Sequence, residues 1–215
     1  MKIGVYTSGN AGRVGKILQS QLFDTVRPSI SWIIHDGNPT TVAETVAQRL
    51  GISFSHVSYP CKTSAEKSAV ISDTLLQKGR TDPVEYIFCF GNRILTGDLL
   101  TVYRNRIINF HPSILPAFKG VNAIDQALNY PALISGNTAH FVDEGVDTGP
   151  IIMHHLFPLP FFEGYDQLLD AQIAMFYQIY IWLKDGRVLL SGRKVTITAA
   201  DYSIGTFVPG LEIPW

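Results

Sequence analysis

The sequence predicts an α/β fold with a mostly parallel sheet. In the first half of the chain, short apolar runs alternate with longer helix-like segments. Such alternation is typical of parallel strands joined by right-handed crossover helices. A chain of 215 residues fits one large α/β domain with an appendage, and it can bury a substantial core. We therefore expect a twisted sheet of about seven strands with helices on both faces.

Hydrophobic periodicity and turn residues place the individual elements. Strands are expected at residues 2–6, 29–35, 53–57, 84–90, 106–108, 136–142 and 150–156. Helices are expected at residues 13–23, 41–50, 64–78, 95–103, 121–129 and 163–184. Thr40 or Thr41 is a candidate cap for the second helix, with Glu44 as the capping-box partner of Thr41. The last strand follows a short turn, so we expect it to run antiparallel to a neighbour.

The chain divides into a main domain, residues 1–186, and a C-terminal segment, residues 187–215. The segment starts with a predicted hairpin of residues 188–190 and 195–197 and continues as a tail rich in glycine, proline and aromatic residues. We expect the tail to pack on the domain or against a second subunit, which makes a homodimer a candidate assembly.

Charge and hydropathy exclude several classes of partner. The formal net charge is −1 and no run of lysine or arginine occurs, so nucleic acid is a poor first guess. No stretch reaches the ~18 apolar residues of a membrane span. The amino-terminal residues lead directly into a predicted strand and lack a signal-peptide pattern. We expect a cytoplasmic protein without a membrane partner.

The cysteines and the paired histidines do not predict a metal site. Cys61 and Cys89 are far apart and show no metal or redox spacing. Because Cys89 lies in an apolar strand, we favour buried free thiols over a disulfide. His154 and His155 are adjacent on one predicted strand and so point to opposite faces, which makes a poor chelate.

The stretch from Asn109 to Gly120 is the first candidate for chemistry. It follows the apolar run at 106–108, so Asn109 should lie at the carboxyl end of a buried strand and His111 just beyond it. Open α/β sheets place their active sites at this edge. Pro112 and Pro116 then force the chain into a stiff loop.

A second polar stretch runs from residue 136 to residue 152. It places His140 on a strand, followed by a turn that contains Asp147 and two glycines. If both strands belong to one sheet, Asp147 can reach His111 and fix its tautomer or pair with the imidazolium. Asn109, His111 and Asp147 would then converge on one cleft.

These stretches closely resemble the formyltransferase family that uses 10-formyltetrahydrofolate, with members that act on glycinamide ribonucleotide nearest in pattern. The matching segments are Asn109-x-His111-Pro-Ser-x-Leu-Pro116, Lys119-Gly-x-Asn122-Ala-x-x-Gln126-Ala-Leu and Thr138-x-His140-Phe-Val-x-x-x-x-Asp147-x-Gly149. The resemblance implies a Rossmann-like formyltransferase fold, with residues 1–186 as the catalytic domain. It also implies that Asn109, His111 and Asp147 are the catalytic residues and that 10-formyltetrahydrofolate is the co-substrate.

The resemblance further implies a binding site for the donor. In the family, the Gly-x-Arg-Ile-Leu segment, which matches residues 91–95 here, lines the pterin pocket through backbone hydrogen bonds and apolar side chains. Such a pocket suits a flat heterocycle with polar edges. An alternative is that Ile94 and Leu95 only pack a short helix onto the sheet. The implied donor-binding residues are Phe90, Gly91, Asn92, Arg93, Ile94, Leu95, His140, Val142, Asp143 and Glu144.

The acceptor site is implied by the glycine turn after the first strand. Such a turn presents backbone N–H groups to anions at a helix N-terminus, although a tight strand-to-helix turn needs glycine anyway. In the family this loop binds the phosphate of the acceptor and usually reads Ser-Gly-x-Gly-Ser-Asn. Ala11-Gly12-Arg13 departs from that pattern. In the family the last helix often brings a glutamate to the acceptor site. The absence of an acidic residue from 172 to 183 is therefore a second departure. The implied acceptor-binding residues are Ser8, Gly9, Asn10, Ala11, Gly12, Arg13 and Pro112.

The resulting hypothesis is an enzyme that transfers a formyl group to a primary amine. The acceptor would be glycinamide ribonucleotide or an amino sugar linked to a nucleotide, a small molecule that can carry phosphate groups. The first alternative is a hydrolase of the same donor, and the second is a non-catalytic folate-binding module. A metallohydrolase built from His111, His140 and Asp147 lacks the usual helical histidine pair.

Overall fold

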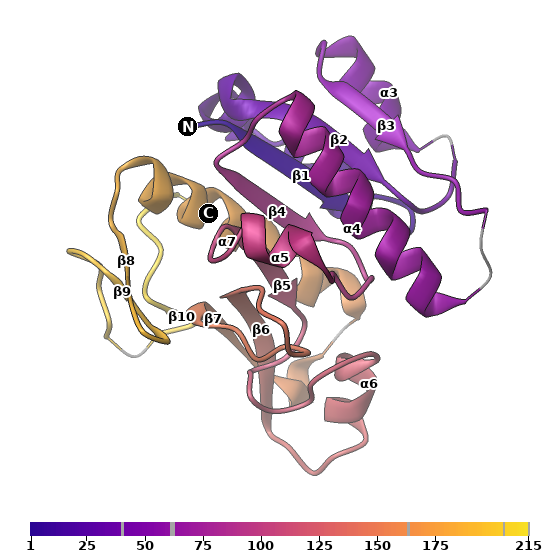
Figure 1. Ribbon diagram of the computed structural model, residues 1–215. Coiled ribbons are helices and arrows are strands. Elements are labelled where there is room, and N and C mark those ends of the chain that lie inside the picture. The colour runs from indigo at the N-terminus through magenta and orange to yellow at the C-terminus, as the bar shows by residue number, and fades with distance from the viewer. Residues whose placement is uncertain (40, 61–62, 163, 204, 215) are drawn as a thin grey trace. The chain divides into compact units, whose positions relative to one another are not determined.

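The computed structural model describes residues 1–39, 41–60, 63–162, 164–203 and 205–214 (Figure 1). They form two compact units, Met1–Ile108 and Asn109–Trp215. Within the described residues, no helix is long and apolar enough to cross a membrane. Cys89 is buried and forms no disulfide. The predictions made for Thr40, Cys61 and Glu163 fall outside the described residues.

Four strands form the sheet of the first unit, in the order β3-β2-β1-β4. They are β1 (Ile3–Thr7), β2 (Ile30–His35), β3 (Ser53–His56) and β4 (Tyr86–Phe90). The pairs β1–β2, β1–β4 and β2–β3 are all parallel. All five residues of β1 are buried, as expected for a strand with neighbours on both sides and helices over its faces. The predicted parallel α/β architecture is confirmed here.

The helices of the first unit connect successive strands. They are α1 (Gly12–Gln19), α2 (Phe23–Val26), η1 (Arg27–Ser29), α3 (Val42–Arg49), α4 (Ser64–Thr81) and α5 (Asp98–Val102). The single helix predicted at 13–23 is two helices, because the backbone of Ser20 is extended at ψ 149°. Thr41 caps α3 by accepting from the N–H of Glu44, and Thr63 caps α4 in a full capping box with Glu66.

Strand β5 (Ile107–His111) leads from the first unit into the second. There it is followed by α6 (Ala123–Leu128), β6 (Ile134–Phe141), β7 (Ile151–Pro158) and later β10 (Phe207–Val208), and the strand order is β5-β6-β7-β10. The pair β6–β7 is antiparallel, as its short connection predicted. Together with the four strands of the first unit, these four give eight strands among the described residues, one more than expected for the main sheet.

The additional strand is β10 (Phe207–Val208), which pairs antiparallel with β7. The tail therefore covers the edge of β7, where a loop had been predicted. Helix η2 (Leu159–Phe161) and the long helix α7 (Tyr165–Lys184) precede the predicted hairpin, formed by β8 (Val188–Ser191) and β9 (Lys194–Ile197). Helix α7 packs on β6 and β7 and buries most of its residues.

Candidate active site

The last residues of β5 carry two of the predicted catalytic side chains. Asn109 and His111 are separated by one residue, so their side chains lie on the same face of the strand. His111 is the final strand residue rather than the first of the loop, and it is buried. Its Nε2 lies 2.8 Å from the carbonyl oxygen of Phe118. Since a carbonyl only accepts, Nε2 carries a proton.

The loop after β5 is held by hydroxyl groups. Ser113 donates to the carbonyl of Ala117 at 2.7 Å. Thr138 of β6 donates to the carbonyl of Ser113 at 2.6 Å and accepts from the N–H of Leu115 at 2.9 Å. The loop is thereby fixed to the neighbouring strand immediately after His111, which limits the positions its imidazole can take.

The loop between β6 and β7 carries Asp147 in a left-handed backbone conformation, φ 50°. It is closed by a hydrogen bond of 2.9 Å from the N–H of Phe141 to the carbonyl of Pro150. Gly149 is required at this closure, because a Cβ atom there would lie 1.7 Å from the carbonyl oxygen of Phe141. The tight turn directs the carboxylate of Asp147 toward β5.

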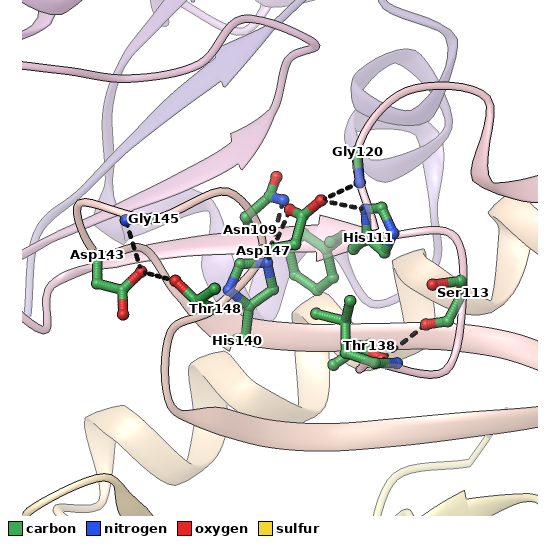
Figure 2. A network of polar contacts seen from close by, with 12 residues as sticks. Asn109, His111, Ser113, Gly120, Thr138, His140, Asp143, Gly145, Asp147 and Thr148 are labelled. Atoms are coloured by element: carbon green, nitrogen blue, oxygen red, sulfur yellow. Dashed lines mark hydrogen bonds and ion pairs between the residues drawn. The ribbon is translucent and has the colours of Figure 1, made fainter. Parts of the chain in front are cut away.

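The carboxylate of Asp147 is where the two stretches meet (Figure 2). Its Oδ2 accepts from the N–H of Gly120 at 2.8 Å and lies 3.3 Å from Nδ1 of His111. Its Oδ1 lies 3.6 Å from Nε2 of His140. The structure therefore brings Asn109, His111, His140 and Asp147 together. The sequence predicted this meeting for Asn109, His111 and Asp147, whereas it assigned His140 to the donor site.

The hydrogen bonds of His140 determine its tautomer. Nδ1 lies 2.9 Å from the carbonyl oxygen of Phe141, so Nδ1 carries the proton. Nε2 then accepts from the amide nitrogen of Asn109 at 3.3 Å. This contact orients the Asn109 amide, and the second N–H of that amide can donate to a substrate oxygen.

Burial and neighbouring groups shift the pKa values of both His111 and Asp147. Burial lowers the pKa of His111 below its ordinary value, although the Phe118 carbonyl and the Asp147 carboxylate act to raise it. Burial alone would raise the pKa of Asp147, but the contact with His140, the hydrogen bond from the Gly120 N–H and the nearby imidazole of His111 lower it below the ordinary value. At neutral pH the pair thus rests as a neutral imidazole beside a carboxylate. A proton added to Nδ1 would be held directly by Asp147.

The predicted donor segment at the end of β4 lies in the first unit. The guanidinium of Arg93 donates from Nε to the carboxylate of Asp36 at 3.1 Å. Leu95 is buried, whereas 56% of Ile94 is exposed. The segment therefore both packs and presents an apolar side chain, so the two readings of Ile94 and Leu95 are compatible.

The predicted acceptor loop is held by its own polar groups and by Asp36. Ser8 donates to the Asp36 carboxylate at 2.5 Å and accepts from the N–H of Asn92 at 3.1 Å. Gly12 donates its N–H to the side-chain oxygen of Asn10 at 3.0 Å. Asn10 therefore occupies one of the amide donors that an anion would use.

The side chain of Arg13 contacts Phe90 within the first unit. Its guanidinium donates to the carbonyl of Phe90 at 2.8 Å and lies 5.4 Å from the centre of the Phe90 ring. Burial lowers the pKa of Arg13 to about 10. The side chain links the first loop to the end of β4.

Three further predicted binding residues follow His140 on the β6–β7 loop. Val142 and Asp143 are half-buried and Glu144 is exposed. Asp143 accepts from Thr148 at 2.6 Å within the same loop. Pro112 is half-buried next to His111. The binding roles assigned to these residues stay predictions.

Sequence reasoning missed several groups that shape the site. The backbone groups of Phe118 and Gly120 carry no sequence signal. Asp36 and Arg193 are separated from their partners by long stretches of chain, whereas Gly120 and Thr138 lie in segments that match the family pattern. Among the described residues, no group of three or more His, Cys, Asp or Glu side chains is arranged so that it could hold a metal ion.

Comparison with known proteins gives a consistent family. The model of the family described as Formyl transferase matches residues 1–168. Phosphoribosylglycinamide formyltransferase of Bacillus subtilis (strain 168) is 36% identical over 152 residues, which are 70% of this chain and 76% of that protein.

Solved structures agree with this result. Glycinamide ribonucleotide transformylase 1 from Symbiobacterium toebii is 30% identical, with a TM-score of 0.74 over 92% of this chain and 93% of that chain. A formyltetrahydrofolate deformylase from Pseudomonas syringae pv. tomato str. DC3000 is 20% identical, with a TM-score of 0.74 over 91% of this chain and 65% of that chain. At that identity the likeness shows the fold alone. The chain belongs to the formyl transferase family of folate-dependent one-carbon transferases.

Proposed function

We propose that this enzyme transfers the formyl group of 10-formyltetrahydrofolate to the primary amine of glycinamide ribonucleotide or a closely related acceptor. The observation that carries the proposal is the meeting of the Asn109, His111 and His140 side chains around the Asp147 carboxylate. Such a cluster offers neutral N–H donors beside a proton acceptor. Transfer of an acyl group to an amine requires both.

The donors act on the charge that develops during the reaction. The unprotonated amine attacks the formyl carbon, a new C–N bond forms, and the carbonyl oxygen becomes an oxyanion. Asn109 donates its second amide N–H to that oxygen, while His140 holds the amide in orientation. One preorganised donor of this kind typically contributes ~3 kcal/mol to lowering the barrier. The Nε2–H of His111 is already donated to the Phe118 carbonyl, so Asn109 supplies the N–H donor to the oxyanion.

Proton transfer completes the exchange. The attacking nitrogen loses a proton to Asp147, directly or through water, and the folate nitrogen gains one as its bond to the formyl carbon breaks. The Asp147 side chain is 12% exposed, so a substrate or water can reach it. His111 Nδ1, 3.3 Å from Asp147, can then accept that proton. No covalent bond to the enzyme is needed.

Glycinamide ribonucleotide is the first acceptor to test, because the relatives with 36% and 30% identity are named for it. A nucleotide-linked amino sugar is the second. Two features favour this second acceptor. The side chain of Asn10 accepts the N–H of Gly12 in the predicted phosphate loop, and no acidic residue occurs from 172 to 183. The predicted cytoplasmic location and homodimer remain to be tested by fractionation and by sedimentation.

The experiment follows release of tetrahydrofolate from 10-formyltetrahydrofolate. The purified protein is incubated with glycinamide ribonucleotide, with several nucleotide-linked amino sugars, and with buffer alone. We expect release that depends on an amine and is abolished by Asp147→Asn and by His111→Ala, with circular dichroism spectra unchanged. Equal release in buffer alone would instead identify a hydrolase. No release under any condition would contradict the proposal.

A further inference from the structure

The turn that carries Asp147 is held at both ends by one carboxylate. Oδ1 of Asp143 accepts from the N–H of Gly145 at 3.2 Å and from the hydroxyl of Thr148 at 2.6 Å (Figure 2). Asp147 lies between these two points, in its left-handed conformation. The position of its carboxylate therefore depends on how well this turn is held.

A side chain from outside the turn completes the arrangement. Arg193, at the tip of the β8–β9 hairpin, donates from one guanidinium nitrogen to Oδ2 of Asp143 at 3.2 Å and from another to the carbonyl of Thr148. The carbonyl that accepts the second bond belongs to Thr148, the residue directly after Asp147. Arg193 thus contacts both ends of the turn at once, as the planar guanidinium permits.

The hairpin and the loop together line an open cavity of about 660 Å³. The loop lines it with Thr148, Gly149, Pro150 and Ile151, and the hairpin with Ser191, Arg193, Lys194 and Val195. Close packing does not fill this space, so the polar contacts of Arg193 bridge it. Such a bridge fixes geometry more than it adds stability, because an ion pair with a 67% exposed arginine adds little to the free energy of unfolding.

We propose that Arg193 is a positioning residue for Asp147, acting through Asp143 and Thr148 to hold the carboxylate against His111 and Gly120. The inference rests on the proposed function. It gives the C-terminal hairpin a part in the reaction, although no hairpin residue lies in the cluster of Asn109, His111, His140 and Asp147.

The test compares Arg193→Ala and Arg193→Lys with Lys194→Ala, a matched change at the next residue of the hairpin. We expect Arg193→Ala to lower kcat ~10- to 100-fold, because small displacements of a reacting group have large effects on rate. The donor KM should change less than ~3-fold if the loss lies in the transition state. Arg193→Lys should recover part of the rate, because a single ammonium group replaces only one of the two contacts. Lys194→Ala should behave as wild type.

Three further measurements separate positioning from a structural role. In Arg193→Ala the acid limb of the kcat–pH profile should move to higher pH, because Asp147 loses part of the contact that keeps its carboxylate ionised. Added methylguanidinium should restore kcat to Arg193→Ala and leave Asp147→Asn inactive. The midpoint of thermal unfolding should fall by only ~2–4 °C.

Several outcomes would overturn the inference. They are a wild-type kcat in Arg193→Ala, a raised donor KM with kcat unchanged, or a loss of rate that follows thermal stability without a pH shift or rescue. None of them bears on the proposed function, which fails only if the wild-type enzyme shows no amine-dependent release.

Discussion

The backbone N–H of Gly120 donates to the carboxylate of Asp147 across 27 residues of chain, at 2.8 Å, and the same oxygen faces His111 Nδ1 at 3.3 Å. Two loops, one after β5 and one after β6, therefore meet at a single atom. The imidazole of His140, the N–H of Gly120 and the imidazole of His111 together lower the pKa of Asp147 in spite of its burial. The same carboxylate acts to raise the pKa of His111.

Replacing Asp147 should therefore shift the titration of His111. Burial lowers the pKa of His111 in the wild-type protein, and Asp147→Asn should lower it further because the opposing charge is removed. NMR titration of the imidazole protons measures this directly. Asp24→Asn, a change at an exposed carboxylate of α2, should leave the titration where it was. A rise in Asp147→Asn would contradict the assigned pairing.

Removing the amide of Asn109 should reduce the rate more than the binding of substrates. Asn109→Ala loses an oxyanion donor, so kcat should fall ~10²- to 10³-fold. Steady-state kinetics with saturating donor and acceptor measures it. Asn129→Ala, which changes an exposed asparagine at the end of α6, is the matched control. An unchanged kcat in Asn109→Ala would remove this residue from the reaction.

A methyl group at Gly149 should distort the β6–β7 loop. The added Cβ would lie 1.7 Å from the Phe141 carbonyl oxygen, so the hydrogen bond that closes the loop must lengthen. Gly149→Ala should cost ~1–3 kcal/mol of stability and most of the activity, because Asp147 lies two residues away. Thermal unfolding and kcat are the measurements. Gly205→Ala is the control, since its Cβ would meet only Phe207 oxygen at 3.7 Å.

His155 should make the protein less stable in mild acid. Burial lowers the pKa of His155 to about 4, from 6.5 for an exposed histidine. Between these values the unfolded chain binds a proton that the folded protein does not bind. The free energy of unfolding therefore falls as the pH falls from 6.5 to 4, by up to ~3 kcal/mol for this group.

Urea unfolding at a series of pH values tests this prediction. His111 and His154, whose pKa values are also lowered, contribute in the same direction. The relevant quantity is therefore the difference between wild type and His155→Gln, whose free energy of unfolding should depend less on pH. His56→Gln, a change at an exposed histidine, should keep the wild-type slope. Equal slopes in wild type and His155→Gln would contradict the prediction.

The elements that sequence reasoning located best are those with strong local signals. The parallel strands of the first unit and the helices α3 and α4 lie within a few residues of their predicted bounds, because apolar periodicity and caps are encoded within one segment. The break at Ser20 and the strand β10 were missed. Ser20 lies inside an apolar pattern that continues past it, and β10 exists only because β7 offers an unpaired edge.

The identities and spacing of Asn109, His111 and Asp147 were enough to recognise the family and to name the candidate chemistry. Which atoms meet was settled only by folding: Nε2 of His111 faces the Phe118 carbonyl, Nδ1 faces Asp147, and His140 joins them to Asn109. Contacts such as Arg193 to Asp143, 50 residues apart, depend on strand pairing and on the paths of two loops. A linear pattern of residue types does not contain that information, because hydrogen bonds depend on distances and directions between segments that come together only in the folded chain.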